Sequence, residues 1–160
     1  MRLLLACVGR PKAGPERDLA AHYIARAAAA GRAIGFPGVE LRETTESRAG
    51  RSEDRKREEA KALRSLLPPG FAVVALDETG KQMTSRGLAA ELGRQRDESS
   101  AGAAFIIGGP DGLDPAFLAS SSLTLAFGTM TWPHQLARIM AAEQIYRAMT
   151  ILSGHPYHRD

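Results

Sequence analysis

Glycine-rich segments follow three apolar runs of the chain. These runs end at Leu76 and Asp77, at Ile107, Gly108 and Gly109, and at Phe127 and Gly128. If the runs are parallel strands, their carboxyl ends lie side by side and form one wall. Glycines would leave space there for a flat group, such as an adenine or a ribose, beside backbone N–H and C=O groups. The pattern favours a ligand site over the alternative of three separate tight turns.

The standard phosphate-binding and hydrolytic motifs are missing from the sequence. The first apolar run is followed by Gly9, Arg10 and Pro11 rather than by G-x-G-x-x-G, and G-x-x-x-x-G-K-[ST] does not occur. H-E-x-x-H and G-x-S-x-G do not occur either. His155 and His158 are three residues apart with no third ligand nearby, so a structural role is favoured over a metal site. These observations argue against a dinucleotide enzyme and a P-loop NTPase.

The length and the charge distribution limit the class of protein. A chain of 160 residues with 44% hydrophobic residues predicts a single domain over residues 1–160. The net charge is +3, with +4 in residues 1–32, +1 in residues 33–70 and −2 in residues 71–160. A phosphate-binding surface is therefore expected to draw on the first third of the chain. The alternative for that third is a solvated, arginine-rich face.

Cys7 is the single cysteine, so the chain cannot form an internal disulfide or a cysteine-based zinc site. It lies within the apolar run of residues 3–8, which predicts a buried, inert thiol. The same run is too short to span a bilayer and does not form a convincing signal peptide. We therefore expect a reducing, cytoplasmic setting and no membrane partner.

The glycine-rich segments lie in a predicted alternation of strands and helices, which must hold them in position. The pattern predicts strands over residues 2–9, 39–42, 71–76, 103–107 and 123–127, and helices over residues 15–30, 52–67, 84–96 and 134–152, with a short helix after Asp114. Residues 44–50 are expected to form a flexible loop. Acidic and basic residues alternate after Ser52, which predicts an exposed, salt-bridged helix face. Because most strands lack polar alternation, we expect an α/β fold with a parallel sheet covered on both faces.

The helix predicted over residues 134–152 carries two apolar stripes. One contains Leu136, Ile139, Met140, Tyr146 and Met149, and the other contains Ala137, Ala141, Ile145, Ala148 and Leu152. A surface helix needs only one such stripe. The second stripe indicates packing against a second subunit or, equally, burial on two sides within one chain. Glu143 and Arg147 are spaced to form an i, i+4 ion pair.

Several segments, in a fixed order, resemble one enzyme family. They are LLLACVGRPK, ALDETGKQMTSRGLAAEL, GGPDGL, TMTWPHQLARIMAAEQIYRA and the ending HPYHRD. In these segments the chain is similar to the small SPOUT-class methyltransferases that act on large-subunit ribosomal RNA, the RlmH family. The resemblance covers the whole chain and is weakest over residues 33–65. Trp132 departs from it, since members often have Leu or Phe there.

The resemblance implies a function and a set of site residues. Similar enzymes use S-adenosylmethionine to methylate N3 of a pseudouridine in 23S rRNA on the assembled ribosome. They are homodimers with a deep C-terminal trefoil knot, here over about residues 71–152. The implied cofactor-binding residues are Leu76, Gly108, Gly109, Phe127, Gly128, Thr129, Met130, Thr131 and Trp132. The tail of residues 153–160, with His155 and Arg159 as substrate-binding residues, is expected near the cofactor of the other subunit.

Methylation of N3 requires loss of its proton, so a positioning or proton-accepting group is expected. The candidates are Tyr157 and His158 in the tail, and His134 and Arg138 at the start of the last helix. Capping or dimer contacts are the alternative roles for these residues. No metal is needed for methyl transfer from a sulfonium. The rival functions are a non-catalytic RNA- or ribosome-binding factor, a methyltransferase of this class with another RNA target, and an enzyme that acts on a small nucleotide.

Overall fold

Five parallel strands form one sheet in the computed structural model, which describes residues 1–159. They are β1 (Arg2–Val8), β2 (Val39–Thr44), β3 (Phe71–Gln82), β4 (Gly102–Ile107) and β5 (Leu123–Ala126). Their order across the sheet is β2-β1-β4-β3-β5, and every neighbouring pair is parallel. β1 and β4 have neighbours on both sides and are buried along almost their whole length, which explains their continuous apolar sequences. The predicted α/β class with a parallel sheet is confirmed.

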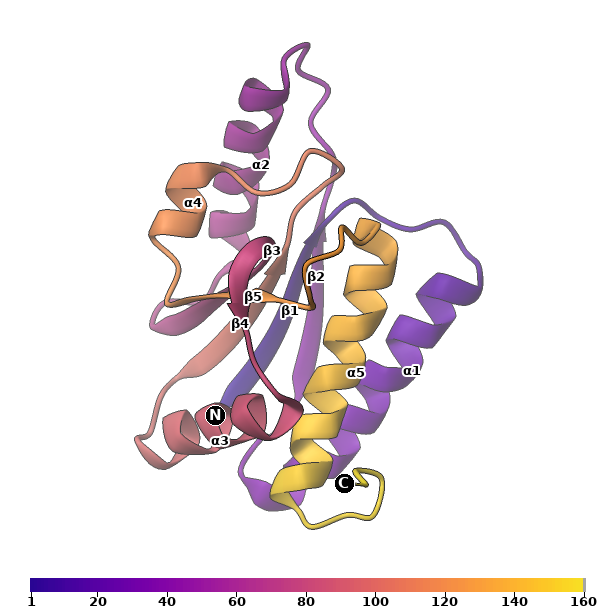
Figure 1. Ribbon diagram of the computed structural model, residues 1–160, viewed down its shortest axis with the longest axis vertical. Helices are drawn as coiled ribbons and strands as arrows, with labels where there is room; N and C mark the ends of the chain where they lie inside the picture. The colour runs from indigo at the N-terminus through magenta and orange to yellow at the C-terminus, as the bar shows by residue number, and fades with distance from the viewer. Residues whose placement is uncertain (160) are drawn as a thin grey trace.

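Helices cover both faces of this sheet (Figure 1). The helices α1 (Pro15–Gly31), α3 (Ser85–Asp97) and α5 (His134–Leu152) pack on one face, and α2 (Ser52–Leu66) and α4 (Pro115–Ala119) pack on the other. A 3-10 turn, η1 (Arg32–Ile34), follows α1. Successive residues of β1 alternate between the two layers, so Cys7 faces the α1 and α5 side while Val8 faces α2. Cys7 is fully buried, and burial raises the pKa of its thiol to about 12, as expected of an inert cysteine.

β3 continues beyond the point at which the sequence predicts its end. Leu76 and Lys81 both pair with Leu125 of β5, so the four residues between them bulge out of the ladder. Asp77 stabilises this bulge by accepting hydrogen bonds from the backbone N–H and the hydroxyl of Thr79. Gly80 is required where the chain returns, because a Cβ there would lie 2.7 Å from the Leu125 backbone. The break predicted at Asp77 is therefore a bulge inside a longer strand.

Residues 45–51, between β2 and α2, are tied to that helix and do not form the free loop that the sequence predicts. The backbone N–H of Ser47 donates to Glu59 over 2.9 Å, and the Ser47 hydroxyl donates to Glu58 over 2.5 Å. Arg55 donates to the carbonyls of Ala49 and Gly50. A polar segment without periodicity is held here by side chains of the following helix.

The carboxyl ends of the strands, the start of α2 and the start of α5 lie at the same end of the molecule (Figure 1). The chain's C-terminal tail lies at the opposite end of α5. No helix formed by residues 1–159 combines the length and the hydropathy that a membrane crossing requires. The knot implied over about residues 71–152 stays a prediction, as does the assignment of residues 1–160 to a single domain.

Candidate functional site

A cavity of about 810 Å³ opens at the bulge of β3 and at the carboxyl end of β4. Its walls come from the bulge after Leu76, the GGPDG loop after Ile107, and the loop that joins β5 to α5. These are the three glycine-rich segments that the sequence places at neighbouring strand ends. Parallel pairing of β3 with both β4 and β5 brings them to one edge, as expected for an α/β sheet.

Glycines determine how closely the GGPDG loop folds upon itself. A Cβ on Gly108 would lie 2.8 Å from the backbone carbon of Gly112, and one on Gly109 would lie 3.0 Å from a carboxylate oxygen of Glu59. Gly112 has a φ of +84°, in the left-handed region that favours glycine. The loop can therefore present backbone groups to the cavity only with glycines at these positions.

The structure places eight of the nine implied cofactor residues in the wall of this cavity. These are Leu76, Gly108, Gly109, Phe127, Gly128, Met130, Thr131 and Trp132. Thr129 does not line it, although its neighbours on both sides do. His134, one of the candidate catalytic residues, also lines the cavity at the first residue of α5.

Every carboxylate in the cavity wall is bound to a protein partner. Asp77 accepts from Thr79, Glu78 accepts from the Thr131 hydroxyl over 2.7 Å, and Asp111 forms a two-point ion pair with Arg55. The Arg55 guanidinium holds the pKa of Asp111 below its usual value, mainly through these hydrogen bonds. Lys56 is the remaining charged side chain of the wall.

Arg138 does not line the cavity, contrary to what a direct catalytic role would require. Its side chain is 2% exposed and pairs with Glu43 over 2.5 Å. It also donates to the carbonyl of Gly9 over 2.7 Å. These contacts join the first turns of α5 to the carboxyl ends of β1 and β2. Arg138 therefore fixes the start of α5 after the loop that follows β5. Its catalytic role stays a prediction.

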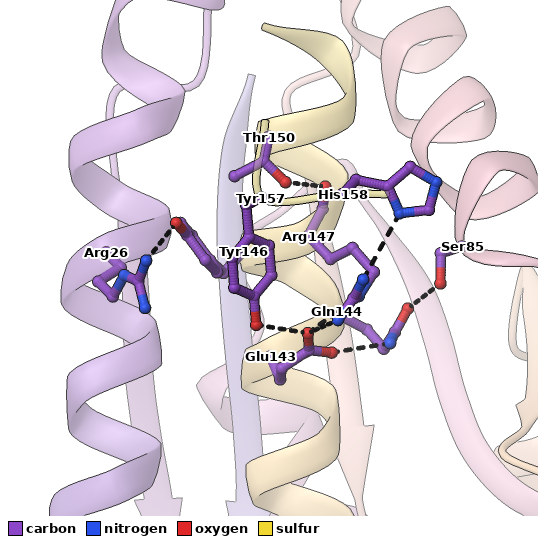
Figure 2. Close-up of polar contacts among 9 residues, drawn as sticks. All are labelled: Arg26, Ser85, Glu143, Gln144, Tyr146, Arg147, Thr150, Tyr157 and His158. Atoms are coloured by element: carbon purple, nitrogen blue, oxygen red, sulfur yellow. Dashed lines mark hydrogen bonds and ion pairs between the residues drawn. The ribbon is translucent and has the colours of Figure 1, made fainter. Parts of the chain in front are cut away.

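The tail folds back onto α5 and forms a polar cluster of its own (Figure 2). The Tyr157 hydroxyl donates to Glu143 over 3.0 Å, and the same Glu143 oxygen accepts two bonds from Arg147. The predicted ion pair of Glu143 with Arg147 is thus present. Arg147 Nη1 lies 3.5 Å from Nδ1 of His158. In this chain, Tyr157 and His158 are brought together around Arg147 and not at the cavity.

Aromatic rings and a further arginine complete this tail cluster. The rings of Tyr146 and Tyr157 are 4.6 Å apart, and Arg26 of α1 lies 4.3 Å from the Tyr146 ring centre. Arg26 also donates to the Tyr146 hydroxyl over 2.6 Å. Burial, followed by the neighbouring Tyr23 and Glu143, raises the pKa of Tyr157 well above its usual value. In this position the Tyr157 hydroxyl donates its hydrogen bond to Glu143.

Residues further along α5 line a second hollow, of about 550 Å³. Its wall includes Leu19 and Tyr23 of α1 and Ile139, Met140 and Glu143 of α5. Phe127 and Gly128 line both spaces, so the loop before α5 separates them. Leu19, which lines this hollow, is an exposed large apolar side chain, and so is Leu136 of α5. Met130 and Trp132 are exposed as well but line the first cavity. The first apolar stripe of α5 is therefore only partly covered within one chain.

Arg55 and Glu59 of α2 support the GGPDG loop from behind the cavity wall, and the sequence does not single them out. The alternating charges of α2 predict an exposed face, yet Glu59 is 3% exposed and lies against Gly109. Arg55 and Glu59 are four residues apart, so they lie on one face of the helix. This spacing is the signal in the sequence that places both on the same side of α2. Among residues 1–159 no group of three or more His, Cys, Asp or Glu side chains is arranged to hold a metal ion.

Comparison with known proteins agrees with this geometry. A family model described as "Predicted SPOUT methyltransferase" matches residues 1–158. A protein of Beijerinckia indica named Ribosomal RNA large subunit methyltransferase H is 60% identical over 159 residues, 99% of both chains. A protein of the same name from Methylocella silvestris is 59% identical over 160 residues, 100% of both.

A crystal structure of a probable methyltransferase from Bordetella pertussis is 18% identical, with a TM-score of 0.48, and the match covers 91% of this chain and 95% of that one. The family-model match over nearly the whole chain and the identity to full-length relatives agree with the segments that carry the resemblance. The chain belongs to the SPOUT methyltransferase family.

Proposed function

We propose that this protein uses S-adenosylmethionine to methylate N3 of a pseudouridine in 23S rRNA, acting in the cytoplasm on the assembled ribosome. The observation that carries the proposal is the glycine-walled cavity at the bulge of β3 and the carboxyl ends of β4 and β5. It occurs in a chain 60% identical to a relative named Ribosomal RNA large subunit methyltransferase H. The target base and the cofactor follow from the family, and the cavity offers a place for that cofactor.

The residues around the cavity suit the proposed cofactor. Gly108 and Gly109 leave the backbone open toward the cavity, which suits the flat adenine of the cofactor. Leu76, Phe127 and Met130 supply apolar wall for the same group. The carboxylates of Asp77, Glu78 and Asp111 suit a ligand with a positively charged sulfonium. The volume of about 810 Å³ lies within the range expected of a cofactor site.

When bound, the cofactor supplies an electrophilic methyl group on its sulfonium. The protein must hold N3 of the base in line with that methyl and assist removal of the N3 proton. His134 lines the cavity and is the candidate nearest to it in the same chain. Tyr157, His158, His155 and Arg159 belong to the tail, which supplies further groups to bind and orient the RNA.

The tail is proposed to serve the cavity of a second subunit in a homodimer. Tyr157 contacts α5 at Glu143, which lies nine residues after His134 and thus about 13 Å further along the helix. The tail therefore does not reach the cavity of its own chain. Leu19, Leu136 and Trp132, with 43%, 43% and 40% of their surface exposed, provide an apolar face on which a second copy can pack.

A methyl-transfer assay with ribosomes, free rRNA and a nucleoside in parallel tests the proposal. Label is expected on ribosomes alone, at N3 of one pseudouridine identified by mass spectrometry. Label at another base would show a different RNA target, and label on the nucleoside would show a small-molecule enzyme. Ribosome binding without methylation or cofactor affinity would show a non-catalytic factor. Light scattering at micromolar protein is expected to give the mass of a dimer.

A further inference from the structure

Glu59 is a buried carboxylate with one oxygen that has no partner. Its Oε1 accepts the backbone N–H of Ser47, whereas Oε2 is buried and makes no hydrogen bond within the described part of the chain. Burial of a charged oxygen without a partner is costly, so such a group calls for an explanation. The proposed reaction, as derived above, does not use Glu59.

The carboxylate of Glu59 lies directly behind the cavity wall. A Cβ built on Gly109 would come within 3.0 Å of Oε2 and 3.3 Å of Oε1. Gly109 itself lines the cavity. Because residue 109 has no side chain, only one backbone unit separates the carboxylate from the space in which a ligand would sit. A charge this close to the cavity acts on the ligand even when it is partly screened by solvent.

The charges around the cavity do not balance. The wall and the residues behind it carry four carboxylates, namely Asp77, Glu78, Asp111 and Glu59, against two cations, Lys56 and Arg55. Their sum is −2 in a chain whose net charge is +3. Asp111 is neutralised by the two-point contact of Arg55, and Asp77 and Glu78 are bound to hydroxyl groups. Glu59 is the acid whose charge is least compensated.

We propose that Glu59 is a specificity-determining residue that favours the positively charged cofactor over its neutral product, acting across Gly109. The proposal rests on the proposed function, since it takes S-adenosylmethionine as the ligand. Methyl transfer turns the sulfonium into a neutral thioether, so the ligand loses one positive charge while its shape is almost unchanged. A negative wall then binds the product less tightly than the cofactor, which promotes exchange of one for the other. Glu59 is a positioning residue in this sense, because it acts through the loop and not by contact with the reacting atoms.

The test measures the dissociation constants of S-adenosylmethionine, sinefungin and S-adenosylhomocysteine by calorimetry at pH 8. Sinefungin serves as a stable ligand with an additional positive charge. For the E59Q variant we expect the preference for the two charged ligands over the neutral one to fall about tenfold, as removal of one partly screened charge requires. E59D is expected to restore part of the preference. E58Q is the matched control, because Glu58 is the neighbouring acid on the exposed face of α2 and should leave the ratio unchanged.

Each outcome has a defined meaning. If the unmodified protein binds none of the three ligands, the proposed function is wrong. That result differs from the two results that overturn the role of Glu59. If E59Q weakens all three ligands equally, Glu59 only shapes the loop, and the inference is overturned. An unchanged ratio in E59Q overturns it as well. Circular dichroism and thermal unfolding of each variant establish that the measured protein is folded.

Discussion

The cavity and the tail cluster lie on opposite halves of α5 and carry charges of opposite sign. Around the cavity, carboxylates outnumber cations, and its wall is largely backbone fixed by glycines. In the tail cluster, Arg26 and Arg147 surround the single carboxylate of Glu143, and almost every contact is made by side chains. This difference suits two ligands, a cationic cofactor in the first region and a polyanionic RNA at the second. The cavity is thus a preorganised site, whereas the tail cluster can exchange its side-chain contacts when a ligand binds.

The largest effect is expected where α5 is joined to the sheet near the cavity. Arg138→Met removes a buried ion pair and leaves Glu43 and the Gly9 carbonyl without their donor. We expect a loss of about 3 kcal/mol in the free energy of unfolding, measured by urea denaturation. Arg94→Met is the control, because Arg94 is 54% exposed and its ion pairs should contribute less than about 1 kcal/mol. Equal losses in the two variants would show that the buried pair does not fix the helix start.

The next effect concerns the backbone wall of the cavity. Gly108→Ala places a Cβ 2.8 Å from the Gly112 backbone, so the GGPDG loop must move. We expect cofactor affinity to fall about 100-fold, which corresponds to roughly 2.7 kcal/mol. Gly38→Ala is the matched control, since a Cβ there meets nothing within 4 Å. Calorimetric titration that gives the same affinity for Gly108→Ala and the unmodified protein would exclude this loop from the cofactor site.

The tail is expected to affect turnover more than cofactor binding. Tyr157→Phe removes the hydroxyl that donates to Glu143 but keeps the ring against Tyr146. We expect kcat on ribosomes to fall about tenfold or more, with cofactor affinity changed less than about twofold. His158→Ala is expected to act in the same direction. Full turnover in both variants would remove the tail from the reaction and would leave the two halves of α5 without distinct roles.

The smallest effect is a pH dependence of stability that comes from Glu59. Burial raises the pKa of Glu59, Asp111 and Glu46 raise it further, and the Ser47 N–H and Arg55 oppose them. A carboxyl group whose pKa is raised by folding stabilises the protein while protonated, and that contribution is lost as the pH rises through the raised pKa. Glu59→Gln should therefore increase the free energy of unfolding at pH 8 by about 1 kcal/mol and change it little at pH 4. A lower stability at pH 8 would show that the ionised form is the stabilising one.

The sequence predicts the layers of this fold well, because continuous apolar runs and helix signals are local. The run over β4 and the Asp114 cap before α4 are found where the pattern places them. The bulge after Leu76 is missed, because it depends on the partner strand β5. The burial of Arg138 and Glu59 is not predicted, for a related reason. Their sequence neighbourhoods are typical of exposed helix faces, and only the packing of α5 and α2 on the sheet buries them.

The same limit applies to the site. The order of strands and loops predicts that the glycine-rich loops meet at one edge of the sheet, since parallel strands share their carboxyl ends. The position of the tail depends instead on side-chain contacts with α1 and α5, and Tyr157 meets Glu143 across 14 residues of sequence. No local pattern predicts such a contact. The hydrophobic pattern also does not predict whether the chain is knotted, because a knotted and an unknotted path use the same strands and helices.

The buried thiol of Cys7 can be used to measure how often the core of the protein opens. Its pKa of about 12 leaves almost no thiolate at neutral pH, and the side chain has no exposed surface. A thiol reagent can therefore label the protein only when β1 separates from α5 and α1. Because Cys7 is the single cysteine, the labelling rate in buffer counts openings of the central core without any engineered probe. The proposed dimer formation, ribosome binding and cofactor binding can each be tested as a change in that rate.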